Sequence, residues 1–141
     1  SLAQAEILKI NEIQYRMKSL KEIELEKYLL NNFVLSNGII YCLMPLKQLE
    51  KLDAIKSDCD FFSSKLISIQ GANIAFSVIE SSPNFYEISL RSKNGFNVRN
   101  VATALGGGGH IPAAGAKVNS ESIEKVKDNI IEIIKSQEEK S

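Results

Sequence analysis

Hydrophobic positions recur with a helical period through the first part of the chain. Ile10, Ile13, Met17 and Leu20 fall at steps of three and four residues, with lysine, glutamate and glutamine between them. Such spacing places apolar side chains on one face of a helix. No glycine or proline interrupts the stretch, so it predicts a helix from Leu2 to about Leu30. The narrow stripe favours a connector that packs on another domain or a second copy; the alternative is an ordinary amphipathic helix followed by a helical turn.

Apolar runs of strand length follow, separated by turn signals. They span residues 39–44, 74–79 and 85–91, and a shorter run at 116–118 predicts a final strand. Asn37-Gly38 precedes the first run, and Ser81 to Asn84 joins the second and third as a hairpin. These features predict three strands of ordinary length and one short strand.

Helical spacing returns between the strands. It predicts a short helix through residues 46–52, a helix capped by Ser57 or Asp58 that ends at Gly71, and a helix from Asn97 to Leu105. A last helix is expected to start at Asn119 or Ser120, with a frayed tail over 136–141. The chain is therefore expected to be α/β (α+β), a mixed sheet of four or five strands with flanking helices and an N-terminal connector helix. Residues 1–32 would form the connector and residues 33–141 the domain.

Composition narrows the function classes. Lys plus Arg and Asp plus Glu are both 17, so a net charge of zero argues against a broad basic face for long nucleic acid but allows a local phosphate pocket. Cys42 and Cys59 lack zinc-ligand spacing, which favours reduced thiols in a cytoplasmic protein. No apolar stretch approaches the ~20 residues of a membrane span, and no signal peptide opens the chain. The absence of an initiator Met at Ser1 suggests a segment of a longer protein.

The run from Gly106 to Gly115 carries most of the functional information. Four consecutive glycines cost folding entropy, which a compact domain tolerates where the backbone needs positive φ or close approach of a ligand. Successive glycine N–H groups can also form an anion-binding concavity. His110, the one histidine of the chain, and Pro112 follow directly. A flexible surface loop is the plain alternative, but this order of residues favours a phosphate or nucleotide site.

Arg91 and Ser92 lie at the end of the third predicted strand, where binding sites in open sheets are common. Arginine offers a planar fork that matches phosphate oxygens, and serine adds a hydroxyl donor. Arg99, one turn into the following helix, is expected to be a solvated charge. If that helix runs back over the sheet, the glycine run lies on the opposite rim from Arg91; a short loop and a returning last strand would bring Arg91 and His110 together.

The residues do not form a catalytic constellation. His110 is expected to contact ligand rather than to act as a packing residue or as a catalytic acid or base. The sequence holds no Ser–His–acid pattern, no second histidine and no carboxylate cluster for two metal ions. Asp58 and Asp60 are better explained by placement at a helix N-terminus. We therefore expect a binding domain with no catalytic and no metal-ligating residues of its own.

Three segments together resemble a known family. Ser89-Leu90-Arg91-Ser92, the helix from Val98 to Leu105 and the run from Gly106 through His110 to Ala113-Ala114-Gly115 are similar to the DHH-associated C-terminal domain of the Asp-His-His phosphoesterases. The similarity spans roughly 37–135. Within that family the chain looks closest to the bacterial oligoribonucleases (nano-RNases) and 3′,5′-bisphosphonucleotide phosphatases.

The resemblance implies the C-terminal half of a two-domain hydrolase. Its N-terminal Asp-His-His domain would hold two manganese ions and hydrolyse the phosphoester, and this domain would bind short oligonucleotides, dinucleotides or 3′,5′-bisphosphonucleotides. The implied substrate-binding residues are Arg91, Ser92, Gly107, Gly108, Gly109 and His110. The chain itself has no Asp-His-His motif, so on its own it is expected to be inactive and to carry no cofactor. A non-catalytic nucleotide- or RNA-binding module and a dimerisation module, including a homodimer, are the alternatives.

Overall fold

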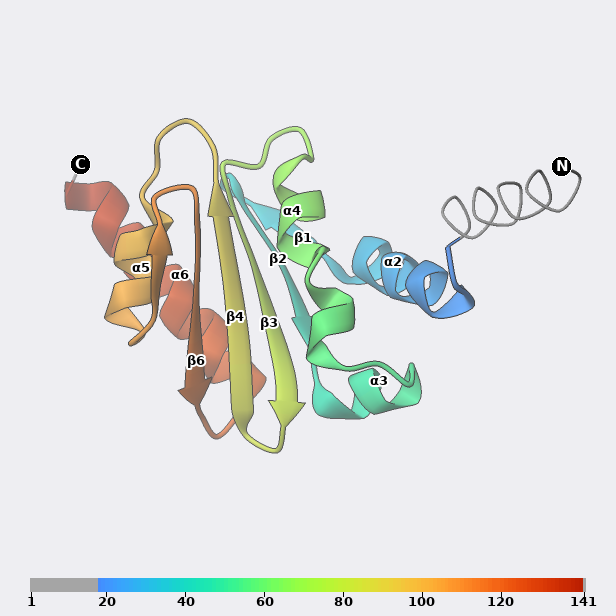
Figure 1. Ribbon diagram of the computed structural model, residues 1–141. Coiled ribbons are helices and arrows are strands. Elements are labelled where there is room, and N and C mark those ends of the chain that lie inside the picture. Colours follow the sequence, from blue (N-terminus) through green and yellow to red (C-terminus); the bar gives the residue numbers. More distant parts are fainter. Residues whose placement is uncertain (1–17, 141) are drawn as a thin grey trace, which may run out of the picture.

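The computed structural model describes residues 18–140, which form a single mixed sheet with helices on both faces (Figure 1). The sheet order is β1-β2-β3-β4-β6-β5; β2 and β3 pair in parallel, and the other neighbours are antiparallel. The strands are β1 (Val34–Ser36), β2 (Ile39–Met44), β3 (Ile74–Ser82), β4 (Phe85–Ser92), β5 (Gly108–His110) and β6 (Ala113–Asn119). The predicted mixed α/β fold is confirmed. Within the described residues the sheet has six strands rather than four or five, because β1 and β5, each of three residues, join its two edges.

The helices are α2 (Leu20–Asn32), α3 (Leu46–Lys51), α4 (Phe62–Ile67), α5 (Val98–Ala104) and α6 (Ile123–Lys140), with a 3₁₀ helix η1 (Lys56–Cys59) before α4. They cover the two faces of the sheet unequally. One face carries α2, α3, η1 and α4, whose buried side chains pack on β2 and β3. The opposite face carries α5 and α6, and in Figure 1 α6 passes behind the sheet.

The alternation of β4 decides which side chains belong to which face. Tyr86, Ile88 and Leu90 are buried against α5 and α6, so the odd-numbered positions of β4 face the other way. Along β3 the first six of nine positions are buried, because this central strand has helices on both of its faces. Antiparallel pairing continues the alternation of β4 into β6, where Ala114 and Val118 also pack toward α5 and α6.

Local signals fixed several element boundaries as expected. The Asn97 side chain accepts a hydrogen bond from the Asn100 N–H at 3.1 Å and caps α5. Asn37 and Gly38 have φ values of 53° and 81°, the two left-handed residues of a tight turn between β1 and β2. The predicted helix cap at Asn97 and the predicted turn at Asn37-Gly38 are therefore confirmed.

Other predicted boundaries were wrong. Asp58 lies inside η1 and accepts from the Ile55 N–H, while α4 starts without a side-chain cap. The last helix starts at Ile123, with the Ser122 hydroxyl accepting from the Lys125 N–H, and it stays helical to Lys140 instead of fraying from residue 136. In both places a nearby serine or aspartate side chain accepts a hydrogen bond from a backbone N–H. Residue propensity alone does not predict which of several neighbouring polar residues takes that role.

Within the described residues, the helix predicted from Leu2 to Leu30 begins only at Leu20. Ser19 is extended (φ −67°, ψ 159°) and its hydroxyl accepts from the Glu22 N–H, so α2 begins at Leu20. Leu25 and Leu29 are buried in the core beside β2, which means that α2 packs on this domain. The part of the predicted helix within residues 1–17 lies outside the described residues, and the division at residues 32 and 33 stays a prediction.

Both cysteines are free and buried. Burial raises the pKa of the Cys42 and Cys59 thiols to about 12, so neither is a reactive thiolate at neutral pH. Of the helices within residues 18–140, none is both long enough and apolar enough to cross a membrane.

Candidate functional site

Three neighbouring strands bring the predicted residues into rows across the sheet. Arg91 of β4 pairs with Ala113 of β6, and Ala113 pairs in turn with His110 of β5. Residues paired across antiparallel strands share a face of the sheet. Arg91 and His110 therefore flank Ala113 on one face, so the returning last strand does bring them together.

The next row along the strands supplies small residues. Ser89 pairs with Gly115, and Gly115 pairs with Gly108. This row lies on the same face as Arg91, the face on which α3 and α4 cover the other half of the sheet. Beyond α4, which still contacts β4, none of the helices labelled in Figure 1 lies over this face of β6 and β5.

A hollow of about 370 Å³ lies on this bare surface. Its floor is made by the strand residues, and η1 and α4 form its wall. The lining includes Arg91, Gly108, Gly109 and Gly115 from the strands and Lys56, Asp60 and Ser63 from the wall. Of the six residues predicted to bind substrate, three line this hollow, namely Arg91, Gly108 and Gly109.

Arg91 is the unpaired cation of the hollow. Its side chain is exposed and forms no ion pair or hydrogen bond with any residue between 18 and 140. Lys56, by contrast, already holds the Asp60 carboxylate at 2.7 Å. A free guanidinium can donate two parallel hydrogen bonds to a phosphate or a carboxylate. The hollow therefore has one strong anion-binding group ready for use.

His110 lies at the rim, on the three-residue edge strand β5. It is exposed, and its side chain forms no hydrogen bond with the described part of the chain. An edge strand also leaves the backbone N–H groups of its outer side unpaired. The part of the glycine run from Gly108 to Gly109 thus forms an edge strand with His110 and not an irregular loop.

The glycines of this run have different roles. A Cβ on Gly107 would lie 2.1 Å from the Gly115 carbonyl oxygen, and one on Gly109 would lie 2.6 Å from the Ala114 Cα. Gly109 also has φ +143°. At Gly108 an added Cβ meets no atom within 4 Å, and its φ is not in the left-handed region. Gly107 and Gly109 are required by the fold, whereas Gly108 borders the hollow with free space above it.

Ser92 is placed differently from Arg91. Successive side chains of a strand point to opposite faces, so Ser92 lies on the face opposite to Arg91. Its hydroxyl donates to the Phe96 carbonyl at 2.6 Å and thereby closes the loop before α5. A phosphate contact by Ser92 would require that bond to break. Arg99 is exposed on α5, away from the residues that line the hollow.

Sequence reasoning missed Lys56, Asp60 and Ser63, which reach the hollow from another part of the chain. No local pattern marks them, because their position depends on how η1 and α4 pack on β3. The alternation rule, however, would have separated Arg91 from Ser92. It would also have added Ser89, two residues before Arg91, to the same face.

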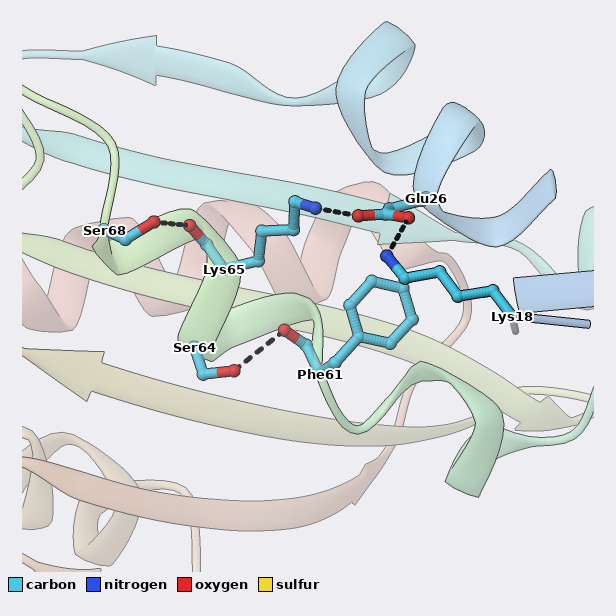
Figure 2. A network of polar contacts seen from close by, with 6 residues as sticks. All are labelled: Lys18, Glu26, Phe61, Ser64, Lys65 and Ser68. Carbon is cyan, nitrogen blue, oxygen red and sulfur yellow. Dashed lines mark hydrogen bonds and ion pairs between the residues drawn. The ribbon is translucent and has the colours of Figure 1, made fainter. Parts of the chain in front are cut away.

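A larger hollow of about 920 Å³ lies elsewhere, between α2 and the segment from η1 to α4. Figure 2 shows its charged wall, where Glu26 accepts hydrogen bonds from both Lys18 and Lys65. Those bonds lower the pKa of the Glu26 carboxyl to about 2. Its lysines are already paired with carboxylates, and none of the predicted site residues reaches it. Size alone therefore does not make it the anion site.

Metal ligands are lacking in the described chain. Residues 18–140 contain no group of three or more His, Cys, Asp or Glu side chains placed to hold a metal ion. The residues present do not fit the two manganese ions that the resemblance implies. Any such ions would have to be held by residues outside this stretch.

Comparison with known proteins shows the family and the fold of the chain. The sequence model of the DHHA1 domain matches residues 37–136. The chain is 38% identical over 119 residues to the bifunctional oligoribonuclease and PAP phosphatase NrnA of Mycoplasma pneumoniae, covering 84% of this chain and 36% of that protein. The protein of the same name from Mycoplasma genitalium is 32% identical over 117 residues, 83% of this chain and 36% of its own length. The chain thus spans about a third of the length of these relatives.

Solved structures share the fold. An exopolyphosphatase-related protein from Bacteroides fragilis superimposes with a TM-score of 0.78 at 23% identity, over 86% of this chain and 36% of that one. A pGpG-specific phosphodiesterase, PggH from Vibrio cholerae, gives a TM-score of 0.60 at 15% identity, over 82% and 39%. At these identities the likeness concerns the fold alone.

Proposed function

This chain belongs to the DHHA1 domain family, and we propose that it is the substrate-binding C-terminal domain of a DHH-family phosphoesterase. Relatives that are 38% and 32% identical are named for oligoribonuclease and PAP phosphatase activity. The substrates proposed here are accordingly short oligonucleotides, dinucleotides or 3′,5′-bisphosphonucleotides. An N-terminal DHH domain of the same protein would supply two manganese ions and the hydrolytic step, in the cytoplasm.

The unpaired Arg91 over the glycine floor is the observation that carries this proposal. Its guanidinium lies beside the hollow, with Gly108 leaving room for close approach and His110 at the rim. A phosphate placed there would accept hydrogen bonds from Arg91 and from backbone N–H groups of the glycine strand. The role of this domain is to bind and orient the phosphate, since its described residues hold no metal cluster.

The affinity of the isolated domain should be low. Each charge-assisted hydrogen bond contributes on the order of 1.5–3 kcal/mol, and only a few such bonds are available here. Association costs about 4–15 kcal/mol in lost freedom. The remaining binding free energy is roughly −4 to −6 kcal/mol, which corresponds to dissociation constants from high micromolar to millimolar. Tight binding of substrate by the whole protein would then need the second domain.

The test compares Arg91→Gln with Arg99→Gln in the full-length protein, using a 5′-phosphorylated dinucleotide and adenosine 3′,5′-bisphosphate as substrates. Arg91→Gln should lower kcat/KM by at least tenfold. It removes charge-assisted hydrogen bonds worth about 1.5–3 kcal/mol each, and a loss of about 1.4 kcal/mol corresponds to a factor of ten. Arg99→Gln, an exposed arginine outside the hollow, should leave it unchanged. Equal kinetics for wild type and Arg91→Gln on both substrates would reject the site.

The division of labour has its own test. The 141-residue chain supplied with manganese should hydrolyse no model phosphodiester above the buffer control. Hydrolysis that survives purification and scales with the concentration of this chain would contradict a purely binding role.

A second candidate function is self-association. Exposed apolar side chains gather on α2 and the adjoining edge strand β1, namely Leu20, Ile23, Leu30, Val34 and Leu35. Apolar patches of this kind mark interaction surfaces. Sedimentation equilibrium of the chain decides the matter, because a dimerisation module should associate at micromolar concentration while a purely nucleotide-binding domain stays monomeric.

A further inference from the structure

The turn between β5 and β6 is held by the segment that connects β4 to α5. Ile111 and Pro112 form this turn, directly after His110. The Ser92 N–H donates a hydrogen bond to the Pro112 carbonyl at 3.1 Å. The Val98 N–H donates to the Ile111 carbonyl at 3.0 Å. Both donors lie outside the turn, so the connection from β4 to α5 fixes its place.

The Ser92 hydroxyl adds a second link to the same turn. It donates to the Phe96 carbonyl at 2.6 Å and lies 3.4 Å from the Ile111 carbonyl. A hydroxyl has one hydrogen to donate, so the contact with Phe96 is the stronger of the two. Through its side chain and its N–H, Ser92 thus ties the loop before α5 to the turn after His110.

The orientation of Ser92 makes its effect on the hollow indirect. Its side chain lies on the face opposite to Arg91, and it is not among the residues that line the hollow. A hydrogen bond from the Ser92 hydroxyl to a ligand would take its donor away from the Phe96 carbonyl. The contact with substrate that the family resemblance implies for Ser92 is therefore not the role this geometry favours.

His110 is the group whose position the turn controls. It is the last residue of β5, and it pairs with Ala113, which pairs in turn with Arg91. Its exposed side chain forms no hydrogen bond with any residue between 18 and 140. The imidazole is therefore placed by the backbone of the turn alone, and a shift of the turn changes its distance from the Arg91 guanidinium.

We propose that Ser92 is a positioning residue, which holds His110 beside Arg91 and does not itself touch the ligand. This inference rests on the proposed function of the Arg91 hollow. It divides the work between two adjacent residues of β4: Arg91 binds the anion, and Ser92 keeps the rim of the hollow in place.

The experiment is a double-mutant cycle of Ser92→Ala and His110→Ala, measured by ¹H–¹⁵N NMR titration of the 141-residue chain with AMP. AMP should shift the amide signals of Arg91 and Gly108 in the wild type. Ser92→Ala should weaken AMP binding about threefold to tenfold, the effect of one or two hydrogen bonds. In the His110→Ala background the same change should cause no further loss, because residues that act through one another are not additive.

Two variants serve as controls. Ser92→Thr keeps the hydroxyl and should bind AMP like the wild type. Ser68→Ala removes a hydroxyl-to-carbonyl hydrogen bond of the same 2.6 Å length outside the hollow and should also leave the affinity unchanged. Without ligand, hydrogen exchange of the Val98 amide should accelerate in Ser92→Ala and not in Ser68→Ala. If Ser92→Ala does not fold, Ser92→Cys, a weak donor of similar size, replaces it in the cycle.

The outcomes separate this role from the proposed function. Additive losses in the cycle would mean that Ser92 contacts the ligand directly and would overturn the positioning role. An AMP affinity that Ser92→Ala or His110→Ala leaves unchanged would overturn it as well, with the Arg91 site intact. If AMP shifts neither Arg91 nor Gly108 in the wild type, the Arg91 site is wrong and the positioning role falls with it.

Discussion

The two halves of the sheet are built for different tasks. Over β2 and β3, helices lie on both faces, and Phe62 of α4 and Phe76 of β3 are completely buried. Over β4, β6 and β5, one face is bare, its residues are small or charged, and Arg91 has no partner within residues 18–140. The covered half stabilises the fold, and the bare half leaves its polar groups available. The comparison teaches that the candidate site lies where the helical cover of the sheet ends, with η1 and α4 as its wall.

The strongest test of this division lies in the covered half. Phe62→Ala should lower the free energy of unfolding by about 3–5 kcal/mol, because it opens a cavity in a fully packed core. Urea unfolding at 25 °C measures this loss. Where the variant stays folded, its NMR titration with a dinucleotide should match wild type. A folded Phe62→Ala domain with altered affinity would break the separation of the two halves; Phe62→Leu provides a milder version of the same test.

A second test concerns Gly109, a residue of the bare half whose substitution should lower the stability of the fold. Gly109→Ala should cost about 3 kcal/mol, since its φ of +143° disfavours any Cβ and that Cβ would collide with Ala114. Thermal and urea unfolding report the loss. If Gly109→Ala unfolds with the wild-type midpoint, the glycine is not required by the fold and its role belongs to ligand binding.

Gly108→Ala tests the converse case, a glycine of the same strand whose substitution should affect ligand binding and not stability. No atom lies within 4 Å of its added Cβ, so stability should change by less than about 0.5 kcal/mol. The same methyl group narrows the approach to the hollow and should weaken nucleotide binding severalfold in the NMR titration. Full wild-type affinity in Gly108→Ala would mean that ligands do not approach over this residue.

The smallest expected effect concerns the charged wall beside α2. The hydrogen bonds from Lys18 and Lys65 hold the pKa of Glu26 at about 2, below its usual 4.5. A depressed carboxyl pKa adds stability that is complete above pH 4.5 and is lost as pH falls toward 2. The urea midpoint of wild type should therefore exceed that of Glu26→Gln at pH 7 and approach it near pH 2. Lys65→Gln should shrink the difference at pH 7, and a difference that persists at pH 2 would contradict the ion-pair explanation.

Sequence alone predicted the parts of this molecule whose signals are local. Asn97 caps its helix, Asn37-Gly38 makes its turn, and the returning last strand places Arg91 and His110 on either side of Ala113. The three-residue strands β1 and β5 were missed because such short elements carry no measurable period. The wall residue Lys56 was missed because its place depends on tertiary packing.

The glycine run shows where prediction from sequence stops. Four adjacent glycines look equivalent in the sequence, yet Gly107 and Gly109 press against β6 while Gly108 does not. Only the register of β5 against β6 distinguishes them. Ser92 is the opposite case, since its hydrogen bond to Phe96 was hidden but its orientation away from Arg91 followed from strand alternation.

Both borders of the sheet are strands of only three residues, β1 and β5. Long exposed edges invite another chain to add a strand, which is a common route to aggregation. Borders this short, one of them made largely of glycine, offer little template for such addition. The short glycine strand that borders the hollow thus also limits the addition of a further strand at that edge.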